Sequence, residues 1–329
     1  MTKVRWGLVG TGGIGTRTVG DLRMCTDAEI TAVASRRQDS ADAFAAEHGI
    51  PHAFGDYADL CASPDVDAIY IGTPHSTHFA YARQALAAGK HVLCEKPLTM
   101  TADEAAELGR LAAERGLFLM EAMWMTFAPA NQHVMREIEA GRIGAPRFLQ
   151  ASVGFPVPAD GPRRYWDPEL GGGALYDLGI YTVTLAQMIF GEVESISASG
   201  VIRPDGVDEH DAYLLHFAGG TAQIVNSLTF FAPPKGWLGG TEGAIDFGEQ
   251  IWSPRTLRIT TGTPPTPPDV EELAFTPEGN GYVPMFRAVN ACILAGETQH
   301  PLHPVSKTVE ALRTIEGIRD LLIARRDAP

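Results

Sequence analysis

Residues 4–15 read Val-Arg-Trp-Gly-Leu-Val-Gly-Thr-Gly-Gly-Ile-Gly, an apolar run that ends in Gly10-x-Gly12-x-x-Gly15 and is followed by a helical pattern. In such a strand–turn–helix unit the first glycine permits a tight turn and the second lets a pyrophosphate approach the backbone. The third lets helix and strand pack closely. The anion then lies at the positive end of the helix dipole. We expect this turn to bind a dinucleotide through Gly10, Thr11, Gly12, Gly13, Ile14 and Gly15. The alternative is a purely structural turn, since the chain has 35 glycines.

The residues after the second predicted strand bear on which dinucleotide binds. Strand 30–34 ends in Ser35-Arg36-Arg37, where an NAD site usually places Asp or Glu to accept hydrogen bonds from the ribose 2′-hydroxyl. Residues 35–38 contain no carboxylate, and the planar fork of arginine donors suits a phosphate dianion. We therefore predict NADP(H), with Arg36 as the main contact and Ser35 and Arg37 beside it. The alternative is a solvated basic pair at a strand end.

Length and composition limit the class of protein. A chain of 329 residues is longer than one core usually fills, so two domains are expected. The net charge of −14 argues against nucleic acid or an anionic membrane as a partner. No apolar run approaches the roughly 18–20 residues that span a membrane. Four scattered cysteines fit a reducing cytosol, and no His–Cys cluster suggests a metal. We expect a cytoplasmic protein without an export leader.

Short apolar runs alternate with helical segments over residues 1–122. The expected strands are 4–9, 30–34, 67–72, 91–94 and 117–121, and the expected helices are 14–24, 39–48, 76–88 and 101–115. Alternation of this kind predicts a parallel sheet with helices on both faces, here an α/β Rossmann domain that binds a dinucleotide. Ligands of such sheets bind beyond the carboxyl ends of the strands.

The pattern changes after residue 122, and we expect residues 123–329 to form an α+β domain for substrate binding and oligomerisation, with a large open, mostly antiparallel sheet. Extended runs are expected at 146–155, 193–203, 210–217, 221–231 and 241–247, and helices at 130–141, 174–190, 284–295 and 305–326. The proline-rich run 263–268 predicts an extended polyproline stretch.

Polar residues follow two strands of the first domain at the edge where a cofactor would lie. Strand 67–72 runs into Thr73-Pro74-His75, with His78 expected in the first turn of the next helix, and strand 91–94 runs into Glu95-Lys96-Pro97. A lysine at this edge can hydrogen-bond a substrate hydroxyl and lower the pKa of a neighbouring acid. The alternative is a surface lysine paired with Glu95. We expect the following residues to line the cofactor site: Thr73, Pro74, His75, His78, Glu95 and Lys96.

Asp177 and Tyr181 lie four residues apart on the predicted helix 174–190, so they share one face. An unperturbed tyrosine has a pKa of about 10, so Tyr181 needs a nearby cation to act near neutral pH, and Lys96 is the candidate. The alternatives are an aspartate that favours the helix dipole and a core tyrosine. Three aromatic residues are candidates to line a substrate pocket: Trp124, Phe155 and Trp166. The alternative is that they are core residues, as aromatic residues more often are.

In this order, the Gly10–Gly15 turn, Thr73-Pro74 with His78, Glu95-Lys96-Pro97 and residues 171–181 resemble the Gfo/Idh/MocA oxidoreductase family. Residues 70–73, 94–97, 116–124 and 179–181 are similar to its dimeric dihydrodiol dehydrogenase branch, also described as NADP-dependent D-xylose dehydrogenase. The resemblance implies a catalytic Lys96, often followed by a cis proline, Tyr181 as general acid/base and Asp177 orienting the substrate.

The resemblance also implies that Arg36 binds NADP and that the open sheet of the second domain often forms a dimer interface. Thr126 stands where the dihydrodiol relatives have arginine, so the substrate identity does not transfer. The sequence therefore predicts an NADP(H)-dependent dehydrogenase for an aldose, polyol or cyclic trans-diol, acting as a homo-oligomer. Two alternatives stay open: a non-catalytic NADP-binding regulator, and a glycosidase that uses transient oxidation with retained NAD.

Overall fold

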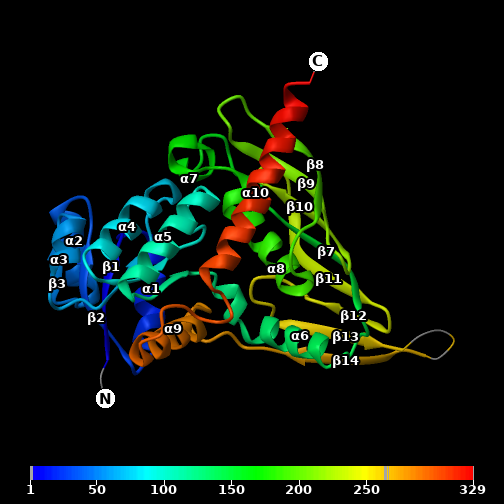
Figure 1. Ribbon diagram of the computed structural model, residues 1–329, viewed down its shortest axis with the longest axis horizontal. Coiled ribbons are helices and arrows are strands. Elements are labelled where there is room, and N and C mark those ends of the chain that lie inside the picture. Colours follow the sequence, from blue (N-terminus) through cyan, green and yellow to red (C-terminus); the bar gives the residue numbers. More distant parts are fainter. Residues whose placement is uncertain (1–2, 263–264, 266, 329) are drawn as a thin grey trace. The chain divides into compact units, whose positions relative to one another are not determined.

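The computed structural model describes residues 3–262, 265 and 267–328 (Figure 1). Residues 263, 264 and 266 of the expected polyproline run therefore lie outside the described residues. The chain divides into two compact units: unit 1 comprises Met1–Trp124 and Glu278–Val309, and unit 2 comprises Met125–Pro277 and Glu310–Pro329. The sequence analysis expected a single boundary after residue 122. The structure divides the chain differently, because residues 278–309 return to unit 1.

In its described residues, unit 1 contains a six-stranded parallel sheet with the strand order β3-β2-β1-β4-β5-β6, as the Rossmann prediction requires. The strands are β1 (Val4–Val9), β2 (Ala28–Ala34), β3 (His52–Phe54), β4 (Ala68–Ile71), β5 (His91–Cys94) and β6 (Leu119–Glu121). Strand order reverses between β1 and β4, and open parallel sheets bind ligands beyond the carboxyl ends of the strands at such a point.

The helices of unit 1 follow the strands in the chain. They are α1 (Gly13–Arg23), α2 (Gln38–His48), α3 (Tyr57–Ala62), the 3₁₀ turn η1 (His75–Thr77), α4 (His78–Ala87), α5 (Ala102–Arg115) and α9 (Val283–Ala295). The sequence analysis missed β3 and α3, because three and six residues are too few to show a period. Helix α9 was expected in the second domain.

A buried tryptophan and a buried aspartate explain why residues 278–309 belong to unit 1. Trp6 on β1 is fully buried, donates its indole N–H to Asn290 Oδ1 on α9 at 3.0 Å and meets Phe286 edge to face. Asp21 on α1 accepts the backbone N–H groups of Asn280 and Tyr282. These polar contacts join segments about 260 residues apart in the sequence.

In the part that the structure describes, unit 2 contains an eight-stranded sheet with the order β14-β13-β12-β11-β7-β10-β9-β8. Strands β7 and β10 are parallel, and the other pairs are antiparallel. The strands are β7 (Pro146–Gly154), β8 (Ser195–Ile202), β9 (Asp208–His216), β10 (Thr221–Ser227), β11 (Ala232–Gly240), β12 (Gly243–Asp246), β13 (Thr256–Thr261) and β14 (Asp269–Ala274). The sequence analysis missed β11, β13 and β14. Strand β11 carries two prolines and three glycines, residue types that strands disfavour.

The helical segments of unit 2 are mostly short. They are α6 (Pro129–Glu139), α7 (Arg163–Trp166), the 3₁₀ turn η3 (Pro168–Leu170), the π-helix η4 (Leu175–Gly179) and α8 (Ile180–Phe190). The 3₁₀ turn η2 (Trp124–Phe127) and the helix α10 (Val305–Arg326) each contain residues of both units. The prediction of one regular helix over 174–190 was wrong in detail, because its first turn is a π-helix. Among the described residues, no helix has the length and apolar character that a membrane crossing requires.

Candidate active site

The glycine turn between β1 and α1 contains glycines that are required for two different reasons. A Cβ atom on Gly10 would lie 2.7 Å from the carbonyl oxygen of Gly72, and the φ angle of Gly10 is +112°. A Cβ atom on Gly15 would lie 2.7 Å from the carbonyl oxygen of Gly10. By contrast, among the described residues, a Cβ atom on Gly12 would meet no atom within 4 Å. Packing therefore explains Gly10 and Gly15, whereas Gly12 faces open space.

The same open space lies at the start of a helix. Gly12 is the N-cap of α1, and no side chain of the described residues caps this end by a hydrogen bond. The first backbone N–H groups of a helix need acceptors from outside the helix. An uncapped helix start next to an open glycine surface fits the pyrophosphate of a dinucleotide.

The residues at the end of β2 carry the predicted NADP contacts. Ser35 lies beside the glycine turn, since its hydroxyl accepts a hydrogen bond from Thr11 Oγ1 at 3.4 Å. Arg37 donates to Ser40 Oγ at 2.8 Å and lies 3.3 Å from Asp39, so part of its hydrogen-bonding capacity is used on α2. Arg36 is exposed. The geometry makes Arg36 the more available cation of the two.

His78 connects the two loops that leave β4 and β5. It begins α4, as expected from the sequence, and it is fully buried. Its Nδ1 lies 2.8 Å from the carbonyl oxygen of Pro97, and its Nε2 lies 2.8 Å from that of Thr73. Burial lowers the pKa of His78, and each of its ring nitrogens contacts a carbonyl oxygen from one of the two loops. Both ring nitrogens thus face the loops themselves.

The Glu95-Lys96-Pro97 segment follows β5 directly, and its Lys96–Pro97 peptide bond is cis. Glu95 is buried, accepts a hydrogen bond from the Tyr70 hydroxyl and accepts a second from the backbone N–H of Lys96 at 3.3 Å. Burial raises the pKa of Glu95 to about 6. Lys96 is half-buried at the carboxyl edge of the sheet, beside the loop that contains Thr73, Pro74 and His75.

In unit 2 the π-helix η4 carries Asp177, and α8 carries Tyr181. Both side chains are largely buried, at 8% and 9% exposure. Asp177 Oδ1 lies 3.1 Å from the guanidinium of Arg164 on α7, and Arg164 also lies over the ring of Tyr165. The Tyr181 ring lies 5.7 Å from the ring of Trp252. The sequence analysis did not assign Arg164 or Trp252 to the site, because no local pattern links them to Asp177 or Tyr181.

Buried polar residues form hydrogen bonds with the segment made of η4 and α8. Asp208 on β9 accepts the backbone N–H of Leu175 at 2.6 Å and pairs with Arg319 at 3.1 Å. A Cβ atom on Gly173 would lie 2.3 Å from Asp208 Oδ1, so the glycines before η4 allow this close approach. Thr182 Oγ1 donates to the carbonyl oxygen of Gly179 at 3.0 Å. These bonds hold the backbone that carries Asp177 and Tyr181.

The three aromatic residues predicted to wall a substrate pocket lie in different units. Trp124 belongs to unit 1 and stacks on Tyr282, with 5.0 Å between the ring centroids. Phe155 belongs to unit 2 and meets Tyr165 edge to face at 5.9 Å. Trp166, also in unit 2, donates its indole N–H to the carbonyl oxygen of Pro158 at 2.9 Å. Phe155, Arg164 and Trp166 thus come from one stretch of the chain, residues 155–166, which follows β7 and includes α7.

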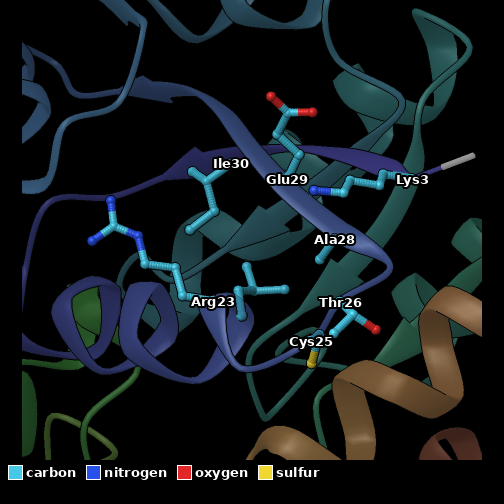
Figure 2. A pocket seen from close by; sticks show the side chains of 8 residues that line it. Lys3, Arg23, Cys25, Thr26, Ala28, Glu29 and Ile30 are labelled. Carbon is cyan, nitrogen blue, oxygen red and sulfur yellow. The ribbon is translucent and has the colours of Figure 1, made fainter. Parts of the chain in front are cut away.

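Figure 2 shows a pocket of about 310 Å³ where β1 and β2 begin and α1 ends. Its lining residues are Lys3, Leu22, Arg23, Cys25, Thr26, Ala28, Glu29 and Ile30. This is the amino edge of the sheet, opposite to the glycine turn, so the pocket does not belong to the site described above. Burial raises the pKa of the Cys25 thiol to about 11. Within the described residues, no group of three or more His, Cys, Asp or Glu side chains is arranged to hold a metal ion.

Comparisons with known proteins agree with this architecture. Residues 4–123 match a family model described as the GFO/IDH/MocA oxidoreductase family with an NAD-binding Rossmann fold, and residues 131–246 match the GFO/IDH/MocA C-terminal domain. The chain is 34% identical over 319 residues to the trans-1,2-dihydrobenzene-1,2-diol dehydrogenase of Xenopus laevis, a match that covers 94% of this chain and 95% of the relative.

Solved structures show the same fold over nearly the whole chain. KijD10, a 3-ketoreductase from Actinomadura kijaniata in complex with NADP and TDP-benzene, is 28% identical with a TM-score of 0.84, covering 97% of this chain and 98% of that one. The aldose-aldose oxidoreductase from Caulobacter crescentus complexed with glycerol is 24% identical with a TM-score of 0.86, covering 98% of each chain, and so is similar in fold. The chain belongs to the Gfo/Idh/MocA family of oxidoreductases.

Proposed function

We propose that this oxidoreductase uses NADP(H) and transfers hydride between the nicotinamide and a secondary hydroxyl or carbonyl carbon of an aldose, a polyol or a cyclic trans-diol. The observation that carries the proposal is the edge of the parallel sheet in unit 1. Neighbouring strands β1, β4 and β5 end there in the open glycine turn, in Thr73-Pro74 and in Lys96. A dinucleotide held by its pyrophosphate at the turn would extend along an edge that already carries a cation.

The preference for NADP(H) rests on the end of β2. Residues 35–38 offer a hydroxyl, two guanidinium groups and an amide but no carboxylate. Arg36 is exposed, whereas Arg37 is partly engaged with Asp39 and Ser40 on α2. A guanidinium binds a phosphate dianion through paired N–H donors. Arg36 is therefore the proposed main contact for a 2′-phosphate, and the NADP in the complex of the relative KijD10 supports this choice.

The proposed chemistry uses three side chains of this chain. When bound, the nicotinamide supplies the acceptor or donor of the hydride. During oxidation Tyr181 takes the proton of the substrate hydroxyl, and Lys96 stabilises the negative charge that develops on that oxygen. Asp177, held by Arg164 at 3.1 Å, accepts a hydrogen bond from the substrate and orients it. A positioned proton-transfer group typically contributes about 10²–10⁴-fold to the rate.

The substrate class is supported by the residues around Asp177 and by the relatives. Phe155, Trp166 and Tyr165 provide aromatic surface close to Arg164 in unit 2, and Trp124 is a further candidate from unit 1. Aromatic faces next to hydrogen-bonding groups suit sugars and cyclic diols. A dihydrodiol dehydrogenase and a 3-ketoreductase are among the similar proteins. Both names describe reactions at a carbon that carries oxygen.

The eight-stranded sheet of unit 2 supports the proposal of a homo-oligomer. Trp237 on β11 is 39% exposed and packs against Phe148 on the neighbouring strand β7. Val270 on β14 and Val201 on β8 are 40% and 44% exposed. The rings of Trp237 and Phe148 form a partly exposed apolar patch on two neighbouring strands, and we propose that a second copy of this chain covers it. We expect size-exclusion chromatography with light scattering to give a dimer or tetramer; a monomer at micromolar concentration would contradict this part of the proposal.

The function is tested by mixing the protein with NADP and, in parallel, with NAD and a panel of aldoses, inositols and trans-dihydrodiols. The formation of NADPH is followed by its absorbance. Turnover with a sugar or a diol, faster with NADP than with NAD, is the expected result. Silence across the panel in both directions would favour the non-catalytic regulator. NAD that co-purifies in stoichiometric amount would instead favour a glycosidase that retains its cofactor.

A further inference from the structure

The fully buried carboxylate of Glu121 contacts the backbone that follows Lys96 and Pro97. Glu121, the last residue of β6, accepts the backbone N–H of Leu98 through Oε1 at 2.9 Å. Its Oε2 lies 2.9 Å from His303 Nε2 and 3.0 Å from Thr308 Oγ1. His303 and Thr308 are themselves buried, at 2% and 0% exposure. All four residues belong to unit 1.

The partners of Glu121 satisfy both of its buried oxygens. A buried carboxylate is unfavourable unless hydrogen-bond donors satisfy its oxygens. Here an amide N–H, an imidazole N–H and a hydroxyl are available for the two oxygens. His303 and Thr308 come from the segment 278–309 that returns to unit 1, about 180 residues after Glu121. The return of the chain therefore completes this cluster.

Glu121 and His78 act on the same peptide group. The peptide between Pro97 and Leu98 has its carbonyl oxygen 2.8 Å from His78 Nδ1 and its N–H group bonded to Glu121 at 2.9 Å. This peptide directly follows Lys96–Pro97 in the chain. Hydrogen bonds at both ends of a peptide group fix the orientation of its plane, and this in turn limits the directions that the preceding residues can take.

We propose that Glu121, held by His303 and Thr308, is a positioning residue for Lys96. Its carboxylate fixes the backbone after Pro97, so that the Lys96 ammonium group meets the substrate oxygen in one direction. The inference rests on the catalytic role proposed for Lys96 above. Displacement of a catalytic group by about 1 Å can lower a rate by about 100-fold, so a residue that touches no substrate can have a large effect on kcat.

The first experiment compares Glu121→Met with Glu121→Gln in steady-state kinetics and in NADPH binding. Methionine removes the acceptor for the Leu98 N–H, and we expect kcat to fall about 10- to 100-fold while the Kd for NADPH changes much less. Glutamine retains a carbonyl oxygen for Leu98, and its amide can donate to His303 and Thr308 after these change their proton positions. We expect Glu121→Gln to recover at least about tenfold of the lost kcat. Equal losses in both variants would overturn the proposal.

Glu104, in the first turn of α5, provides a matched control for Glu121. It accepts the backbone N–H groups of Met100 and Thr101 at 3.2 and 3.3 Å and forms the capping box of α5. Glu104→Met therefore removes a carboxylate that also bonds backbone N–H groups, and it should lower Tm without changing kcat. If Glu121→Met and Glu104→Met lower Tm by the same amount and both leave kcat unchanged, Glu121 has only a structural role.

The decisive measurement repeats the change in a Lys96→Met background. Because Glu121 acts through Lys96, Glu121→Met should cause almost no further loss of kcat there. The same fold loss in both backgrounds would overturn the proposal. If Glu121→Met does not fold, Thr308→Val tests the same point, since it removes one donor to Glu121 and should lower kcat only when Lys96 is present. A Lys96→Met variant with normal kcat would contradict the proposed function itself, a separate outcome.

Discussion

Gly12 and Gly15 lie three residues apart in one turn, and an added methyl group should affect them differently. In Gly15→Ala the new Cβ atom would lie 2.7 Å from a backbone oxygen, so helix and strand must move apart. Overpacking of this kind costs about 1–3 kcal/mol, or about 2–4 °C in Tm for each kcal/mol in a domain of this size. In Gly12→Ala no described atom beyond the adjoining residues lies within 4 Å of the new Cβ. The free energy of unfolding should then change by no more than about 0.5 kcal/mol.

Binding of NADPH should show a further contrast. The methyl group of Gly12→Ala occupies the space that we assign to the pyrophosphate, so it should remove one hydrogen bond from the backbone to a charged oxygen. Such a bond contributes about 1.5–3 kcal/mol, which corresponds to a Kd raised by about 10- to 100-fold. Urea unfolding measures the stability, and a fluorescence titration measures the Kd for NADPH. A Gly12→Ala protein that is as stable as the wild type and binds NADPH equally well would refute this account of the turn.

Three further changes test individual side chains. Arg36→Ala should reduce the preference for NADP over NAD by about 10- to 100-fold, since it removes hydrogen bonds to a charged group. The preference is measured as the ratio of the kcat/KM values for the two cofactors. An unchanged ratio would exclude a contact of Arg36 with the 2′-phosphate. Glu95 has a pKa raised from 4.5 to about 6, so the folded state binds its proton more tightly and loses stability as pH rises from 4.5 through 6. Glu95→Gln should therefore gain about 2 kcal/mol over the wild type between pH 4.5 and pH 7 in urea unfolding, and a pH-independent difference would contradict this. Arg164→Gln should lower kcat/KM about tenfold, because Asp177 loses a charged partner. The control Arg163→Gln removes the ion pair with Asp167 and should have little effect. Equal effects of the two changes would argue against a role of Arg164 at Asp177.

Local patterns were sufficient to predict the parallel sheet and its glycine turn. The units β1–α1, β2–α2, β4–α4 and β5–α5 each carry an apolar run, a turn and a helical period, whereas β3 and α3 are too short to show one. The positions of Gly10, Thr73 and Lys96 at one sheet edge follow from this alternation, because carboxyl ends of parallel strands share an edge. The second sheet was harder to predict, since β11 contains Pro233 and Pro234 and β14 is strongly acidic.

The supporting contacts depend on residues far apart in the chain, and for that reason the sequence did not reveal them. Glu121 and His303 are 182 residues apart. Residues 116–124 resemble the dihydrodiol dehydrogenase branch, but no pattern in the sequence pairs Glu121 with His303 or Thr308. Asp208 bonds the start of η4 from 33 residues away. Gly173, just before the π-helix, approaches Asp208 closely, and a helical period in the sequence does not distinguish a π-helix from an α-helix.

The most direct test of the central claim is the rate of hydride transfer from substrate to NADP in Lys96→Met and Tyr181→Phe, with the best substrate of the panel. Both changes remove a functional group while keeping most of the side-chain volume, and NADPH binding by each variant serves as the control for folding. We predict that kcat falls by more than about tenfold in each, in line with the contribution of a positioned acid–base group. A loss below about tenfold in both variants would contradict the assignment of Lys96 and Tyr181 as the catalytic pair.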